Sequence, residues 1–512
     1  MKGNGTDKKE NMLMSIGIQI NEKRVIGVRD EMLYGHFIEH FHRQIYDGIY
    51  DPKNALSDED GFRTDIIEAM KKIKVPVLRW PGGCFVSSYH WKDAVGPERK
   101  PLFDKAWRVE EPNTFGTDEY IKMCRKIGCE PYICTNAGTG TAEEMSDWVE
   151  YCNLEKEGQY AKWRIANGFE TPHKVKYWSI GNENYGPWEI GAKVSDEWGR
   201  LVREAAKMMK HVDPETELSA AAIPDVNWTF HLLQTCGAYI DWISLHQYWD
   251  MVPEENNLAD YEACMAFTER IDRQVDVVRG MLKALDLEKK IKIAFDEWNL
   301  RSWHHPNVHT IKQGVDKAEY IAPRDKNDDN SAYTMADAVF TACFLNAMNR
   351  NCDIVKMANF APILNTRGCI YSHKDGIVLR STYHVFDLFA NYMGDTVVDL
   401  WVDGELPKWQ VKNKWGAVTE IETLDMLATK WSTRPGLAIS AVNKHRTEAQ
   451  TIVLDCCAGK KVTVYMLQGK DENAYNDVDR TEVNIITKEL GIGTERMEIE
   501  LEPHAVHVIK IV

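Results

Sequence analysis

Short apolar runs recur through the first two thirds of the chain, and polar segments separate them. Eight of these runs are rich in β-branched and aromatic residues, which predicts buried strands. They are Leu33–His40, Val75–Trp80, Glu130–Asn136, Val175–Asn182, Leu218–Ile223, Asp241–Tyr248, Lys292–Asn299 and Cys352–Phe360. Segments between them place apolar residues at i, i+3, i+4 and i+7, which predicts amphipathic helices. Examples are residues 62–73, 117–128, 195–212 and 331–350.

Eight strand–helix alternations predict an α/β fold, a (β/α)8 TIM barrel. An open, doubly wound sheet is the structural alternative. If such a sheet bound a nucleotide, it would carry a glycine-rich phosphate loop after its first strand. The first strand here ends in the motif HFIEH at residues 36–40. The sequence therefore favours the barrel.

The pattern changes after Gly394, where alternating and β-branched runs are separated by turns. This pattern predicts a C-terminal antiparallel β-sandwich, similar to a jelly roll. The opening stretch at residues 14–28 is also strand-like, and we expect it to pair into that sandwich. The predicted division is an N-terminal strand segment at 1–30, a catalytic barrel at 31–393 and the sandwich at 394–512.

One long polar segment, His304–Asn330, shows no clear period. Loops of this length are usually functional or disordered. Because it follows the seventh predicted strand, we expect it to overhang the mouth of the barrel.

The composition of the chain excludes some classes of binding partner and indicates where the protein is located. The chain has 62 Lys and Arg against 78 Asp and Glu, a net charge of −16, which argues against nucleic acid or an anionic membrane. No apolar stretch reaches the roughly 18 residues of a membrane span, and none near the N-terminus has the length of a signal peptide. The 12 Cys form no CxxC pair and no disulfide-rich spacing. Together these features predict a cytoplasmic protein.

Polar residues stand at the ends of five predicted strands. They are Glu39 and His40, Arg79, Asn182 to Asn184, His246 to Tyr248, and Asp296 to Asn299. Burying a charged group beside an apolar strand costs desolvation free energy, so such a group is expected to be paired with another group or to have a functional role. One such group is commonly structural, but five sets at one barrel mouth indicate an active site.

Glu183 and Glu297 end the fourth and seventh predicted strands. Two carboxylates facing each other across a barrel mouth are what glycoside cleavage requires, because one protonates the leaving oxygen and the other attacks the sugar or activates water. Either Glu alone would suit an ion pair, but the two together favour catalysis. Two carboxylates supply all the proton and nucleophile chemistry, so we expect no metal and no cofactor.

Four further side chains fit supporting roles. His246 and Tyr248 share one face of a strand, and Tyr248 is expected to donate a hydrogen bond to the nucleophile. Arg79 is expected to orient a carboxylate bidentately, and Glu39 to accept sugar hydroxyls. The structural alternatives are a buried His–Tyr pair and a Glu39–Arg79 salt bridge.

Aromatic and histidine residues near the predicted mouth leave further alternatives open. Trp107, Trp249, Trp298 and Trp303 lie in or near the predicted loops, where they suit either sugar stacking or rim packing. The motif HFIEHFH holds three histidines, but in a strand positions i and i+4 lie about 13 Å apart, too far for one ion. We therefore expect no metal site there.

The motifs GHFIEH, LRWPGG, WSIGNEN, SLHQY and FDEWN occur in this order. This set resembles glycoside hydrolase family 51, chiefly its α-L-arabinofuranosidases, over nearly the whole chain. The resemblance implies that Glu183 is the general acid/base and Glu297 the nucleophile. It also implies sugar-binding or orienting roles for seven residues: Glu39, Arg79, Cys84, Trp107, Asn182, His246 and Tyr248.

The sequence departs from the family pattern at three places. Cys84 stands where many members carry Asn, and Pro362 is nearest to a position where many carry Gln. Leu300 and Arg301 replace a local aromatic after FDEWN, with Trp303 as a substitute. These differences concentrate in the sugar subsite.

The resemblance implies a retaining, exo-acting α-L-arabinofuranosidase that releases terminal arabinofuranosyl residues from oligosaccharides derived from arabinan or arabinoxylan. The alternative within the family is an endo-β-1,4-glucanase or a xylan-active glycosidase. A non-catalytic carbohydrate-binding protein is a different class, and it would not need both carboxylates. The resemblance also implies a homo-oligomer, a hexamer in many members.

Overall fold

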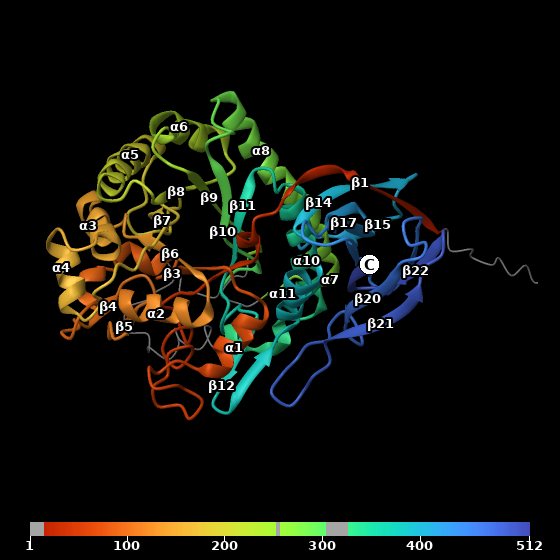
Figure 1. Cartoon of the computed structure of the whole chain (residues 1–512), viewed down its shortest axis with the longest axis horizontal. Coiled ribbons are helices and arrows are strands. Elements are labelled where there is room, and N and C mark those ends of the chain that lie inside the picture. The colour runs from red at the N-terminus through yellow and green to blue at the C-terminus, as the bar shows by residue number, and fades with distance from the viewer. Residues whose placement is uncertain (1–14, 252–256, 304–325) are drawn as a thin grey trace, which may run out of the picture.

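The computed structural model describes residues 15–251, 257–303 and 326–512 (Figure 1). Eight parallel strands close into a barrel in the order β10-β11-β2-β3-β6-β7-β8-β9. They are β2 (Gly35–Phe37), β3 (Val77–Trp80), β6 (Glu130–Thr135), β7 (Tyr177–Ile180), β8 (Glu217–Ala222), β9 (Trp242–Asp250), β10 (Lys292–Arg301) and β11 (Val355–Phe360). Each falls on one of the eight predicted strands, so the predicted barrel is confirmed.

Helices surround the barrel (Figure 1). They are α1 (Thr64–Lys72), α2 (Thr117–Ile127), α3 (Ala142–Asn153), α4 (Gln159–Ala166), α5 (Ser195–Val212), α6 (Val226–Cys236), α7 (Tyr261–Ala266), α8 (Ile271–Ala284), α10 (Met335–Arg350) and α11 (Ser381–Tyr392). In α5 the buried residues Trp198, Val202, Ala205 and Met209 follow the helical period. That stripe is the face which packs on the barrel.

Side chains fill the N-terminal end of the barrel. The cluster consists of Val77, Tyr132, Tyr177, Trp242, Ala294 and Met357, which come from six strands. Layers of this kind make a barrel a packed core rather than a pore. The candidate chemistry therefore lies at the opposite, C-terminal end.

Nine strands form one sheet at the C-terminal end of the chain, in the order β21-β20-β23-β18-β17-β14-β1-β19-β22. They are β1 (Ile16–Val28), β14 (Thr396–Asp403), β17 (Leu424–Lys430), β18 (Leu437–Asn443), β19 (Gln450–Leu454), β20 (Lys461–Gln468), β21 (Asn484–Ile492), β22 (Met497–Leu501) and β23 (Ala505–Ile511). The sheet curls so that residues from both of its ends, such as Ile452 and Ile509, share one core.

The N-terminal strand joins this sheet, as predicted. Strand β1 pairs antiparallel with β14 and buries Ile16 and Ile18. Its other neighbour is β19, and that pairing is parallel. The predicted antiparallel sandwich thus contains one parallel pair, β1 with β19. The reason is that β1 enters the sheet from the far end of the sequence, and no hairpin fixes its direction.

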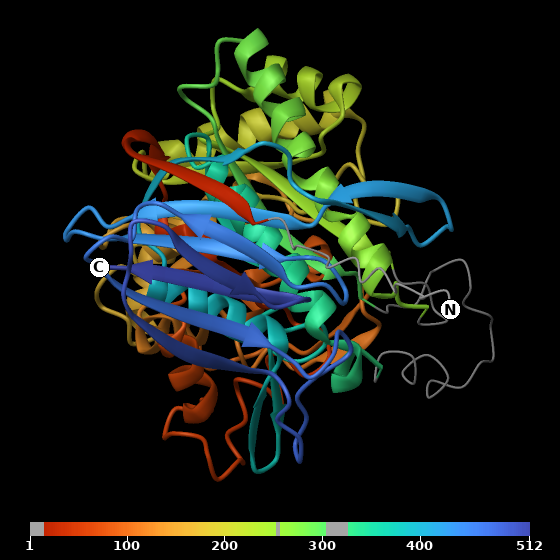
Figure 2. The ribbon, with the colours of Figure 1, turned by 90° about the vertical axis from the view of Figure 1, so that its right-hand side faces the viewer.

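Helix α10 lies between the barrel and the sheet (Figures 1 and 2). Fifteen of its residues, Met335 to Asn349, are buried. One side contacts β10 and β11, and the other contacts β17, β18 and β23. The helix predicted over residues 331–350 is therefore present, but it is buried all round and has no exposed polar face, unlike the amphipathic helix that was expected. The two parts of the chain share this helix as a common core.

Three short hairpins lie outside the barrel and the nine-stranded sheet. They are β4 (Leu102–Asp104) with β5 (Val109–Glu111), β12 (Ile370–His373) with β13 (Gly376–Leu379), and β15 (Lys408–Lys412) with β16 (Val418–Glu422). Most of the predicted loop at 304–330 lies outside the described residues. Among the described residues, no helix has both the length and the apolar content to cross a membrane.

Candidate active site

A bulge in β10 brings two consecutive acidic residues to the inside of the barrel. Ala294 pairs with Ser244 of β9, but the next paired residues are Glu297 and His246. Three steps on β10 thus match two on β9, and a bulge of this kind re-aims side chains beside active sites. Asp296 and Glu297 both reach polar groups of the barrel interior, while Trp298 stacks outward on Phe344.

Glu183 lies just beyond the end of β7 in an unusual backbone conformation. Its φ is +44°, in the left-handed region that few residues other than glycine adopt. Outliers of this kind concentrate at active sites, where the surrounding structure holds them in place. Here the backbone N–H of Gly186 donates to the Glu183 carbonyl, 2.7 Å away, which closes the turn.

The carboxylates of Glu183 and Glu297 face each other across the mouth. An oxygen of each and a ring nitrogen of His246 all lie within 4.8 Å of one another. Retaining glycosidases hold their carboxyl groups about 5–5.5 Å apart, whereas inverting ones need about 6.5–9.5 Å to admit a water. An approach of two carboxylate oxygens to within 4.8 Å is well below the inverting separation and agrees with the retaining one.

Glu297 accepts two hydrogen bonds that favour its ionised form. The Tyr248 hydroxyl donates to Oε1 at 2.7 Å, as the sequence predicted, and the Arg79 guanidinium donates to Oε2 at 3.0 Å. The other terminal nitrogen of Arg79 donates to Oδ1 of Asn182 at 2.8 Å. The expected bidentate contact is therefore wrong, because Arg79 divides its donors between Glu297 and Asn182.

Glu183 is surrounded by donors of a different kind. His246 Nδ1 lies 3.0 Å from Oε1, and the indole N–H of Trp188 donates to Oε2 at 2.7 Å. The Tyr185 hydroxyl donates at 3.3 Å. Trp188 is 53% exposed, so this carboxylate faces the open side of the site.

Burial and neighbouring charges shift the pKa values of the three central groups. Burial lowers the pKa of His246, but the charges of Glu297 and Asp296 and hydrogen bonds to Asp296 and Glu183 raise it to about 10. Burial raises the pKa of Glu183, but the hydrogen bond and charge of His246, together with the hydrogen bonds from Trp188 and Tyr185, lower it by more. For Glu297, burial and the charge of Glu183 raise the pKa and outweigh the charges of His246 and Arg79 and the hydrogen bond from Tyr248. His246 is therefore positively charged at neutral pH.

Glu39 is fully buried beside the two carboxylates. Its Oε1 accepts hydrogen bonds from the indole N–H of Trp107 at 2.9 Å and from the Phe85 backbone N–H at 3.1 Å. Its Oε2 has no hydrogen-bond partner among the described residues. Burial and the charge of Glu297 raise its pKa well above the ordinary value. The alternative of a Glu39–Arg79 salt bridge is not found in the described part of the chain.

A pocket of about 250 Å³ opens over these groups. Its lining consists of Glu39, Cys84, Trp107, Glu183, Trp188, Tyr248, Met251, Glu297, Ser302 and Trp303. This volume is below the roughly 300–1,000 Å³ typical of sites for drug-sized ligands, which suits a single sugar ring. Trp107 and Trp303 thus face the site, while Trp249 and Trp298 pack against Phe344 in the core.

Two family descriptions and several relatives match the chain. Residues 69–266 match the α-L-arabinofuranosidase 1 domain, and residues 296–505 match the α-L-arabinofuranosidase C-terminal domain. An intracellular exo-α-(1→5)-L-arabinofuranosidase of Halalkalibacterium halodurans is 34% identical, over 87% of this chain and 88% of the relative. The α-L-arabinofuranosidase C of Emericella nidulans is 33% identical, over 92% and 93%.

The chain belongs to the α-L-arabinofuranosidase family. Among solved structures, the arabinose complex of the α-L-arabinofuranosidase from Thermotoga maritima superposes with a TM-score of 0.85 at 35% identity. The match covers 97% of this chain and 100% of that one. The family 51 enzyme of Thermotoga petrophila gives a TM-score of 0.84 at 35% identity, with the same coverage. These matches agree with the resemblance to family 51 found in the sequence.

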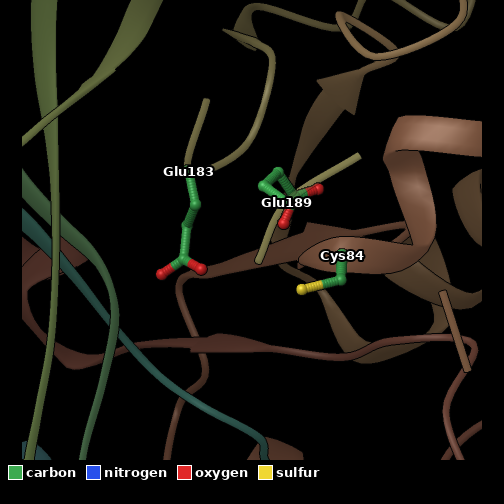
Figure 3. A group of neighbouring side chains, drawn as sticks. All are labelled: Cys84, Glu183 and Glu189. Atoms are coloured by element: carbon green, nitrogen blue, oxygen red, sulfur yellow. The ribbon is translucent and has the colours of Figure 1, made fainter. Parts of the chain in front are cut away.

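In this member of the arabinofuranosidase family, a thiol and a further carboxyl group, those of Cys84 and Glu189, lie beside Glu183 (Figure 3). Oxygens of Glu183 and Glu189 and the Sγ of Cys84 lie within 4.8 Å of one another. Ser87 Oγ donates to Glu189 at 2.5 Å. Burial and the charge of Glu183 raise the pKa of Glu189 to about 8, so it is largely protonated at neutral pH. Burial also raises the pKa of the Cys84 thiol well above its usual range.

Four polar or aromatic groups of the site were missed by the sequence reasoning. They are Asp296, Tyr185, Trp188 and Glu189. Three follow Glu183 in a loop, where no period marks which side chains turn inward. Asp296 lies at a predicted strand end. However, side chains alternate between the two faces of a regular strand, so with Glu297 facing the barrel interior Asp296 was expected to face outward.

The histidines of the HFIEHFH motif lie in separate surroundings. His36 packs between Phe360 and Phe386, His40 contacts Glu111 at 3.0 Å, and His42 contacts Asp328 at 2.9 Å. Among the described residues, the groups with metal-ligand spacing are Cys84 with Glu183 and Glu189, and Glu183 with His246 and Glu297. Both include Glu183, so a metal there would occupy the candidate acid/base.

Proposed function

We propose that this protein is a retaining, exo-acting α-L-arabinofuranosidase that cleaves terminal arabinofuranosyl residues from oligosaccharides. The observation that carries the proposal is that a carboxylate oxygen of Glu183 lies within 4.8 Å of one of Glu297, which accepts hydrogen bonds from two donors. The family's relatives are named for this activity, which favours it over the endo-glucanase or xylan-active alternative.

In the first step, a Glu297 oxygen attacks the anomeric carbon while the bond to the leaving oxygen breaks. Glu183 gives that oxygen its proton, and the sugar becomes an ester of Glu297. In the second step, Glu183 takes a proton from water, whose oxygen attacks the anomeric carbon and releases Glu297. Each carboxyl group ends the cycle in its starting state.

Glu297 suits the nucleophile because its donors, Arg79 and Tyr248, stabilise the ionised form. Glu183 suits the acid because its side chain faces the open side of the pocket, where a leaving group must depart. His246 contacts Glu183 at 3.0 Å and approaches Glu297 to 3.5 Å, so the three groups titrate together. A glycosidic oxygen beside Glu183 favours its protonated form, because that oxygen accepts the proton.

Glu39 and Trp107 suit recognition of the sugar held by Glu297. The unpaired Oε2 of Glu39 is buried in the pocket, where it would cost about 1–3 kcal/mol without a partner. A sugar hydroxyl removes that cost by donating to it. We propose the same class of role for Asn182 and Cys84, which lie close to Glu183 and Glu189.

An assay with an aryl α-L-arabinofuranoside tests the activity directly. Product profiles on arabinan, arabinoxylan and cellulose separate the alternatives, since an exo-acting enzyme releases only monosaccharide from chain ends. Release of mixed oligosaccharides from cellulose or xylan, without arabinose, would favour the endo-acting alternative.

We further propose a cytoplasmic location and a homo-oligomeric assembly. The location is supported by two relatives whose names describe them as intracellular. The assembly, a hexamer by family resemblance, rests on that resemblance alone. Size-exclusion chromatography with light scattering measures it, and a strict monomer would contradict this part of the proposal.

A further inference from the structure

Asp296 is a buried carboxylate directly behind the reactive pair. It has no exposed surface, and the bulge in β10 turns it inward next to Glu297. Burying an ionised carboxylate costs several kcal/mol unless other groups compensate. The side chain must therefore be held by its surroundings.

Four groups surround the Asp296 carboxylate. Ser244 Oγ donates to Oδ1 and the Tyr132 hydroxyl donates to Oδ2, each at 2.6 Å. His246 Nε2 lies 3.4 Å from Oδ1, and Arg79 Nε lies 3.7 Å from Oδ2. These contacts come from β3, β6 and β9, so Asp296 connects β10 to its neighbour β9 and to two strands across the barrel.

The two cations beside Asp296 are the same cations that contact the reactive carboxylates. The far side of the His246 ring meets Glu183 at 3.0 Å, and the far end of Arg79 meets Glu297 at 3.0 Å. Asp296 touches neither the pocket nor the sugar position, since it does not line the pocket. Any effect it has on the reaction must pass through these two cations.

A charge count shows why a second anion is needed beside Glu297. His246 and Arg79 contribute two positive charges, and an ionised Glu297 contributes one negative charge. With Glu183 protonated, as the first chemical step requires, the buried cluster is neutral only if Asp296 is ionised. Hydrogen bonding and charge from His246 and Arg79 do lower the pKa of Asp296 against the effect of burial.

We propose that Asp296 is a positioning residue, which holds the His246 imidazolium and the Arg79 guanidinium in place and so keeps a proton bound within the cluster of His246, Glu183 and Glu297. The inference rests on the proposed glycosidase function. It assigns Asp296 no contact with substrate. Its contribution is to fix the orientation of both cations and to balance their charge.

The proposal predicts a direction for the pH profile. His246, Glu183 and Glu297 titrate as one cluster. Removal of one neighbouring negative charge therefore lowers the apparent pKa of each titration step of that cluster. The titratable groups around the network are Glu39, Arg79, Tyr132, Cys134, Glu183, Tyr185, Tyr248 and Glu297. All of these side chains are still present in a variant that is substituted only at position 296.

The test compares Asp296→Asn with Asp296→Glu and Tyr132→Phe. The Asn variant removes the charge, the Glu variant keeps it, and the Phe variant removes one hydrogen bond to it. We expect the basic limb of kcat/KM on an aryl arabinofuranoside to move about one to three pH units lower in Asp296→Asn only. At the optimum, kcat/KM should fall on the order of 10²-fold. A purely structural role would lower activity without moving the limb, and that result would overturn the proposal.

A second measurement does not depend on activity. NMR of nitrogen-15-labelled histidine, with His246 assigned by comparison with His246→Gln, follows its protonation in the whole protein. We expect His246 to remain protonated through pH 8 in the wild type and to lose its proton at lower pH in Asp296→Asn. A wild-type His246 that titrates near pH 6.5 would overturn the proposal even if the Asn variant does not fold. Absence of arabinofuranosidase activity would instead count against the proposed function, and the NMR result would still decide the role of Asp296.

Discussion

The Tyr248 hydroxyl donates a hydrogen bond of 2.7 Å to Oε1 of Glu297. Both side chains are carried by neighbouring parallel strands, β9 and β10, so the contact is built into the barrel wall rather than into a loop. A donor that is fixed on a strand stabilises the ionised nucleophile without having to be ordered when substrate binds. The bond therefore offers a direct way to test the assignment of Glu297.

Replacing Tyr248 by Phe should raise the pKa of Glu297, because the hydrogen bond favours the ionised form. Glu297 must be ionised to attack, so activity is lost as pH falls through its pKa. A higher pKa moves that loss upward, and the acidic limb of kcat/KM should shift to higher pH. The measurement is the pH profile on an aryl arabinofuranoside. An acidic limb at the wild-type position would contradict the role of Tyr248.

Removing each catalytic carboxylate should affect substrates differently. Glu297→Ala should abolish turnover of every substrate, because no covalent intermediate can form. Glu183→Ala should spare aryl arabinofuranosides far more than natural oligosaccharides, since a good leaving group needs little protonation. Steady-state kinetics on both substrate types measure this. Equal losses on the two types in Glu183→Ala would speak against the acid/base assignment.

The barrel strands could be predicted because a strand covered on both faces is apolar over most of its length. The positions of Glu183, Glu297, His246 and Tyr248 followed, since barrel chemistry gathers at strand ends. Asp296 could not be assigned, because a bulge breaks the alternation on which the reasoning relied. The parallel pairing of β1 with β19 could not be predicted either, because a local sequence pattern does not show which distant strand pairs with β1.

The loop after Glu183 also could not be predicted from the sequence. Trp188 is exposed and donates to Glu183, whereas Glu189, the next residue, is buried against Ser87. Neither fact follows from a periodic pattern, because the segment is irregular. The three-part division at residues 30 and 393 stays a prediction.

Treatment with EDTA should leave activity unchanged, because the two carboxylates supply the proton and nucleophile chemistry. Added zinc, in contrast, should inhibit, since both groups with metal-ligand spacing include Glu183. Initial rates after dialysis against EDTA, with and without added divalent ions, measure both effects. Loss of activity on dialysis that added metal restores would show that a metal is required.

The N-terminal strand should be essential for folding, although it precedes the barrel. Ile18 of β1 is 2% exposed and pairs with Val402 on one side and Leu454 on the other. Truncating such a side chain costs about 2–5 kcal/mol, so Ile18→Ala should lower the free energy of unfolding by that amount. Deletion of all residues before Arg29 should reduce both solubility and activity.

Val25 provides the matched control for Ile18, because it lies on the same strand but is 47% exposed. Val25→Ala should change the free energy of unfolding by less than about 0.5 kcal/mol. Denaturant unfolding of the two variants, followed by circular dichroism, compares them directly. If Ile18→Ala is as stable as Val25→Ala, or if the truncated chain folds and works normally, then β1 contributes little to the sheet and its pairing with β14 and β19 is dispensable.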